Sequence, residues 1–118
     1  MIEVSLVLNP AHSTLEEVVV QGHSGDAGNS VVCAAVTALV RTAARTVESY
    51  GKFTLEGNAD APGKLRFKIT GEENTESGDF IWLMGVTDYL AMGIRDIERE
   101  HPTECKMEIL SGGKRYGT

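Results

Sequence analysis

Residues 22–36, GHSGDAGNSVVCAAV, mark the point where the sequence changes from a strand pattern to a helix pattern. Before them, the run LEEVVVQ at 15–21 is rich in β-branched residues, which are typical of strands. After Val31, apolar residues recur every three or four positions, the spacing of one helical face. Glycines punctuate the segment between. The stretch therefore predicts a strand, a loop and a helix, with Cys33 inside the first helical turn.

The chain before this stretch predicts a hairpin. Apolar and polar residues alternate from position 2 to position 9, as in a half-buried strand. The pair Asn9-Pro10 interrupts that pattern, so we expect a loop over 10–14 that returns into the strand at 15–21.

Two helices follow from the apolar spacing. The first is expected over 31–50, with Ser30 or Asn29 as its N-cap and Gly51 at its end. The second is expected over 75–100, ended by Pro102. Its apolar stripe comprises Phe80, Leu83, Val86 or Thr87, Leu90, Ile94 and Ile97.

The second helix is longer than the expected sheet requires. At 1.5 Å per residue it would extend roughly 39 Å. Trp82 and Met84 also lie off its main stripe. These features indicate either a further buried surface, such as a dimer contact, or an ordinary second side of the core.

The remaining segments predict strands at 53–55, at 64–70 and at 105–109, an exposed acidic loop at 72–79 and a loose tail from 111. The expected order is β-β-α-β-β-α-β. Helices that separate hairpins indicate an α+β fold, with two helices packed on a mostly antiparallel sheet. With 118 residues and 42% hydrophobic content, we expect one domain over 1–118.

Composition also restricts the function. The net charge of −6 argues against direct nucleic-acid binding, which depends on clustered basic residues. No run approaches the about 18 apolar residues of a membrane helix, and no signal peptide is evident, so we expect a cytoplasmic protein without a membrane contact. Two cysteines and three scattered histidines lack the spacing of a metal site, so we expect no metal and no cofactor.

Three interpretations of the loop and Cys33 remain open on the residues alone. The glycines could cradle a phosphate, but their spacing matches no nucleotide-binding motif. Cys33 could be a small buried hydrophobe, as we expect for Cys105 from its strand parity. Alternatively, Cys33 is a nucleophile, because the first turn of a helix stabilises a thiolate. His23 would then be the base, and Thr37 would lie one turn beyond on the same face.

The run G-H-S-x(5)-N-S-V-V-C-A-A-V-T resembles the signature of the ribosomal-processing cysteine protease family, often called Prp. The resemblance extends over the whole chain. It implies a thiol endopeptidase that removes the N-terminal extension of large-subunit ribosomal protein twenty-seven during ribosome assembly. It further implies a homodimer whose substrate tail is joined to a basic protein.

By the motif match, Cys33 would be the nucleophile and His23 the general base. Gly22 keeps the family's glycine, and Thr37 takes the place of a family serine near the thiol. Ser30 stands where the family usually has an aspartate, so it can cap a helix but cannot supply a carboxylate to an imidazole. The alternative is a non-catalytic relative that binds a ribosomal protein or the ribosome surface.

Overall fold

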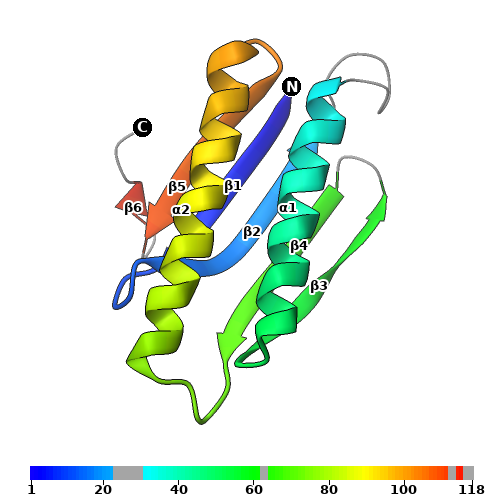
Figure 1. Ribbon diagram of the computed structural model, residues 1–118. Helices are drawn as coiled ribbons and strands as arrows, with labels where there is room; N and C mark the ends of the chain where they lie inside the picture. The colour runs from blue at the N-terminus through cyan, green and yellow to red at the C-terminus, as the bar shows by residue number, and fades with distance from the viewer. Residues whose placement is uncertain (23–30, 62–63, 112–113, 116–118) are drawn as a thin grey trace.

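The computed structural model describes residues 1–22, 31–61, 64–111 and 114–115, and the side chains of all of these except 58–61 and 114–115. Its elements, in chain order, are β1 (Ile2–Asn9), β2 (Thr14–Gly22), α1 (Val31–Tyr50), β3 (Phe53–Ala61), β4 (Lys64–Gly71), α2 (Ser77–Glu100), β5 (Cys105–Ser111) and β6 (Lys114–Arg115). The predicted order is confirmed, and β6 is added to its end (Figure 1).

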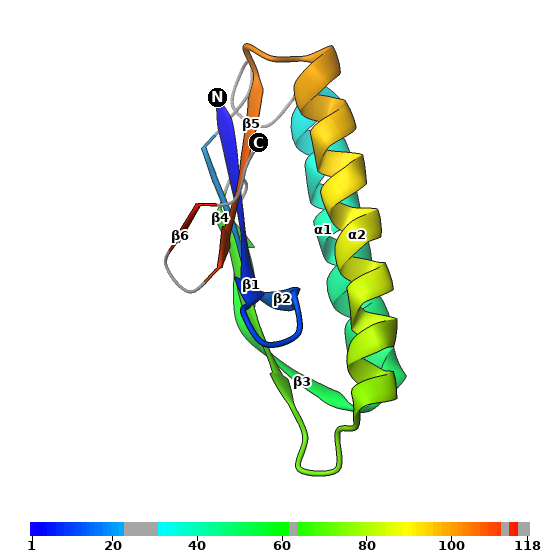
Figure 2. The same ribbon diagram turned by 90° about the vertical axis from the view of Figure 1, so that its left-hand side faces the viewer.

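The strands of the described chain form one sheet in the order β3-β4-β2-β1-β5-β6. Each described pair of neighbours is antiparallel except β1 and β5, which run parallel. Both helices cover the same face of the sheet, as Figure 2 shows. The prediction of an α+β fold with two helices on a mostly antiparallel sheet is therefore confirmed.

The core lies between the sheet and the two helices. Both helices bury most of the stripe that their apolar spacing predicts, although Phe80 and Ile97, at the two ends of the second stripe, are only half-buried. The uncertain position of that stripe is Thr87, because Val86 is also only half-buried. The hydroxyl of Thr87 accepts a hydrogen bond from the Leu15 amide at 3.0 Å and donates to the Leu83 carbonyl at 2.8 Å. These two bonds make a polar side chain tolerable in the core. The buried residues of the helices are Val32, Cys33, Val36, Val40, Ala43, Val47, Leu83, Thr87, Leu90 and Ile94.

Four expected boundaries are wrong. The strand expected at 53–55 continues to Ala61, because β4 supplies a pairing partner to residues with little strand propensity of their own. Thr14 opens β2 instead of ending a loop. The second helix begins at Ser77, so the acidic loop ends at Glu76, whose side chain forms a capping box with Asp79. The tail from 111 is not wholly loose, since 114–115 pair with β5.

Within the described residues, neither helix is long and apolar enough to cross a membrane.

Candidate active site

Cys33 lies in the first turn of α1. The helix begins at Val31, so Cys33 is its third residue, as predicted. The first amide groups of a helix have no partner inside it and form its positive end. The backbone around Cys33 can therefore stabilise a thiolate, or an oxyanion on a carbonyl bound beside it.

The side chain of Cys33 is turned toward the core. It is 8% exposed, whereas that of Val31 in the same turn is 81% exposed. Ala34, the next residue, is exposed and small. This degree of burial fits both interpretations of Cys33, the buried hydrophobe and the shielded nucleophile.

Thr37 lies on α1 one turn after Cys33 and is half-buried. Residues four positions apart occupy the same side of a helix, so its hydroxyl can line the approach to the thiol. The predicted position of Thr37 on the face of Cys33 agrees with the helix, but its role in a reaction stays a prediction.

Gly22 ends β2 in a conformation that requires glycine. Its φ is +93°, and a Cβ added to it would lie 2.2 Å from the carbonyl oxygen of Met1. A side chain here would meet both a strained backbone and a backbone collision. β2 therefore ends at a glycine, the residue directly before His23.

His23, Ser30 and Asn29 lie outside the described residues. The expected loop, the choice of N-cap and the approach of His23 to Cys33 therefore stay predictions. The two ends that flank the segment, Gly22 at the end of β2 and Val31 at the start of α1, lie at the same end of the molecule (Figures 1 and 2).

Cys105 differs from Cys33 in its surroundings. It opens β5 and is fully buried. Burial, together with the nearby negative charge of Glu98, raises the pKa of the Cys105 thiol to about 11. The predicted core position of Cys105 is confirmed, and near neutral pH its thiol stays protonated.

The other two histidines have local partners. His12 stacks on Phe80 with ring centroids 3.8 Å apart, and Nδ1 of His101 lies 3.3 Å from Oε2 of Glu104. In the part of the chain that the structure describes, no group of three or more His, Cys, Asp or Glu residues could hold a metal ion. Neither cysteine forms a disulfide bond.

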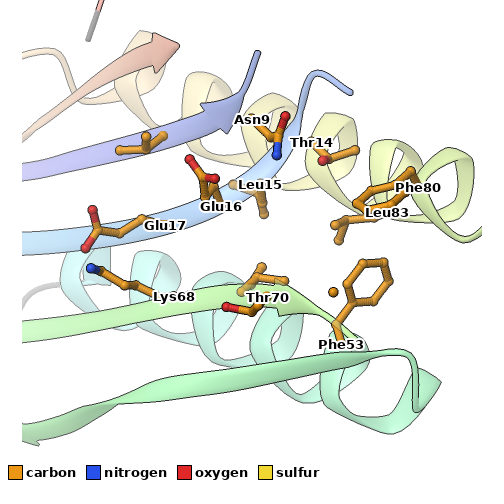
Figure 3. A pocket seen from close by; sticks show the side chains of 13 residues that line it. Asn9, Thr14, Leu15, Glu16, Glu17, Phe53, Lys68, Thr70, Phe80 and Leu83 are labelled. Atoms are coloured by element: carbon orange, nitrogen blue, oxygen red, sulfur yellow. The ribbon is translucent and has the colours of Figure 1, made fainter. Parts of the chain in front are cut away.

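Two cavities that the sequence did not reveal lie away from Cys33. One, of about 400 Å³, opens between β2 and β4 and has Phe53, Phe80 and Leu83 in its wall (Figure 3). The other, of about 630 Å³, is a groove between α1 and α2. Only weak features of the sequence pointed to these cavities: a polar residue, Thr87, on the apolar stripe, and a glycine, Gly85, within the second helix.

A buried thiol in the first turn of a helix is an arrangement suited to a thiol-dependent hydrolase on an α+β scaffold. The chain belongs to the cysteine protease Prp family, whose model matches residues 1–106. No curated protein sequence matches the chain.

Solved structures share the fold. A structure of the ribosomal processing protease Prp from S. aureus with a covalently linked product peptide has a TM-score of 0.73 at 19% identity, covering 92% of this chain and 99% of that one. The same protease with a substrate peptide has a TM-score of 0.72 at 16% identity, with the same coverage of both chains. SMU.848 from Streptococcus mutans has a TM-score of 0.71 at 24% identity, covering 94% and 95%. At these identities the likeness establishes the fold.

Proposed function

We propose that this chain is a cysteine endopeptidase that removes the N-terminal extension of large-subunit ribosomal protein twenty-seven. The observation that carries the proposal is Cys33 in the first turn of α1, in a chain of the cysteine protease Prp family. The peptides bound to S. aureus Prp support a peptide substrate. The reaction takes place in the cytoplasm and needs no cofactor. All of its catalytic groups come from this single domain.

In the proposed reaction the Cys33 sulfur attacks the carbonyl carbon of the scissile peptide bond. The first-turn amides of α1 stabilise the resulting oxyanion. His23 takes the thiol proton and gives it to the departing amine as the C–N bond breaks. Water then hydrolyses the thioester, which returns the acid product and the free thiol.

Three further residues support this chemistry. Gly22 directs the chain out of β2 immediately before His23, and its positive φ supports that role. In this proposal Ser30 is the N-cap of α1, and Thr37 supplies a hydroxyl on the helix face of the thiol. The net charge of −6 suits a substrate whose mature part is a basic ribosomal protein.

We also propose that the chain is a homodimer joined through the outer face of its helices. The large exposed hydrophobic residues of α2, which are Ile81, Met84, Tyr89 and Met92, fall on one side of that helix. Beside them lies the groove of about 630 Å³, lined largely by small residues of α1 and by Trp82.

Gly85 supports close contact at this groove. A Cβ added there would meet nothing within 4 Å, so no contact inside the protomer explains the glycine. Glycine inside a helix costs about 1 kcal/mol relative to alanine, which is acceptable where another backbone approaches closely. Charges agree as well, because exposed Arg41 and Arg45 on α1 can pair with exposed Asp88 on a second copy.

The test of the protease proposal is cleavage of a peptide that spans the extension of the organism's own ribosomal protein twenty-seven, followed by mass spectrometry. The wild-type chain should cut one bond, and Cys33→Ala should abolish cleavage while the peptide still binds. His23→Ala should cost several orders of magnitude in kcat, on the order of 10³-fold or more. His101→Ala, a histidine with a surface partner, serves as the matched control and should retain activity. Binding by the wild-type chain without any cleavage would instead indicate the non-catalytic relative.

A further inference from the structure

The sheet divides between β2 and β4 at the end opposite Cys33. The pairs between these strands run from Gln21↔Lys64 to Glu17↔Lys68, and the described ladder ends there. Both strands continue, and each stays paired on its far side, Thr14 with β1 and Gly71 with β3. The facing sides of the two strands therefore part from one another over their last residues.

Thr87 contributes to this separation of β2 from β4. Because its Oγ1 accepts a hydrogen bond from the Leu15 amide, it holds β2 toward α2. An irregularity in the pairing between Val7 and Leu8 of β1 and their partners increases the bend. Figure 1 shows β2 curving toward α2 while β4 runs on toward the loop before that helix.

The space that opens has an apolar floor and a polar mouth. Its volume is about 400 Å³, and Leu15, Phe53, Ile69 and Leu83 in its lining are all buried side chains. Phe80 completes the wall (Figure 3). The mouth carries the exposed residues Glu16, Lys68 and Thr70.

We propose that this wedge between β2 and β4 binds an extended peptide segment through one large apolar side chain. A strand that lacks a neighbour on one side presents backbone N–H and C=O groups to an incoming strand. Here the β2-facing side of β4 over Ile69–Gly71 supplies such an edge, and the apolar floor lies directly beside it. A backbone edge next to a side-chain pocket is the combination that recognises extended peptides.

The mouth carries two exposed charges of opposite sign, Glu16 and Lys68, so it suits a peptide with a basic and an acidic residue on either side of the apolar one. Nε of Arg66 lies 2.6 Å from Oε2 of Glu17, so that carboxylate already has a cation. Glu16 is exposed and forms no ion pair with any described residue. Its carboxylate is therefore available to a Lys or Arg side chain of the peptide.

The wedge lies far from Cys33. The two ends of α1, at Cys33 and at Tyr50, are separated by about 26 Å at 1.5 Å per residue. Tyr50 stands beside Phe53 of the wedge, with ring centroids 6.1 Å apart. An extended chain advances about 3.3 Å per residue, so one substrate would need about eight residues to reach both places. The link to cleavage rests on the proposed protease function, but peptide binding in the wedge does not.

The test is titration of the full-length wild-type protein with N-acetyl-Lys-Phe-Glu-amide, followed by amide NMR. The amide shifts should centre on Leu15, Ile69 and Leu83. The analogue in which glycine replaces the phenylalanine of the peptide should bind at least about tenfold more weakly. Thr70→Trp, which closes the mouth, should weaken binding by a similar factor. Thr54→Trp is the matched control. Thr54 of β3 is the cross-strand partner of Thr70, is also exposed, and is not part of the lining of the wedge.

Shifts that centre on the groove between the helices, or equal binding by Thr70→Trp and the wild type, would overturn the proposal. A cleavage assay separates it from the protease function. Thr70→Trp should raise the KM of a long substrate and leave unchanged that of a substrate with fewer than about eight residues beyond the scissile bond. A wild-type chain that binds the probe in the wedge but cleaves nothing would reject the protease function alone.

Discussion

The carbonyl oxygen of Met1 occupies the place that a side chain at position 22 would need, 2.2 Å from an added Cβ. We expect Gly22→Ala to lower the free energy of unfolding by about 1–3 kcal/mol, because alanine would also have to adopt a positive φ. Urea denaturation measures this. Gly78→Ala is the control, since its added Cβ meets nothing within 4 Å and should stabilise α2 by up to about 1 kcal/mol. Equal changes in both variants would contradict the argument.

The two thiols should differ in reactivity with pH. Only the thiolate reacts with iodoacetamide, so a thiol with a raised pKa reacts when the pH approaches that value. Burial and Glu98 raise the pKa of Cys105 to about 11, so its labelling should stay slow near neutral pH and increase toward pH 11. Cys33, at the start of α1, should label first near neutral pH. Peptide mapping after native labelling checks this, and preferential labelling of Cys105 would remove the basis for a nucleophile at position 33.

The sequence predicted the surroundings of Cys105 but left those of Cys33 open. Cys105 shares the parity of Met107 in a strand, and strand parity alone determines which face a residue occupies. Cys33 belongs to the first turn of a helix, where exposure depends on how the preceding segment crosses it. Neither parity nor helical spacing contains that information.

At the scale of elements, Thr87 joins α2 to β2. Thr87→Val keeps the side-chain shape but leaves the buried Leu15 amide without its acceptor, which should cost about 1–3 kcal/mol of stability. Urea unfolding measures the loss, and amide exchange at Leu15 should accelerate. Thr46→Val is the matched control, because its exposed hydroxyl donates only to the Thr42 carbonyl of its own helix. A loss at position 46 as large as that at position 87 would contradict the role of the Leu15 contact.

Most of the helices and strands could be predicted from the spacing of apolar residues. The bounds of α1 were predicted, because its stripe is regular and Gly51, with φ +86°, ends it. The length of β3 was not predicted, since its second half owes its conformation to β4. The choice between Val86 and Thr87 also depended on another element, because the partner of the hydroxyl lies 72 positions away in the chain.

At the scale of the whole molecule, the proposed homodimer makes a direct prediction. The wild-type chain should sediment as a dimer, and Tyr89→Glu together with Met92→Glu should yield a folded monomer, because each places a charge on the apolar face of α2. Thr54→Glu, on the exposed side of β3, should leave the dimer intact. A wild-type monomer at the highest soluble concentration would contradict the proposal.

The topology could be predicted only in part. The alternation of apolar residues indicates which face of each strand is buried, but not which strands are neighbours. Two features depend on contacts among several elements. One is the parallel pairing of β1 with β5, and the other is the separation of β2 from β4 over residues 14–16. The residues of the candidate site stay a prediction from their motif, whereas the wedge and the groove required coordinates.

β1 precedes the other described strands in the chain, yet it lies inside the sheet between β2 and β5. Ser5 and Glu108, whose side chains are joined by a hydrogen bond of 3.1 Å, are 103 positions apart in the chain. An emerging chain therefore contains β1, β2 and α1 long before β5 exists, and one side of β1 has no partner during that time. Pairing across nearly the whole chain makes folding slow. The sheet cannot be completed before β5 has been synthesised, and until then its central strand is an edge with which other nascent chains can pair.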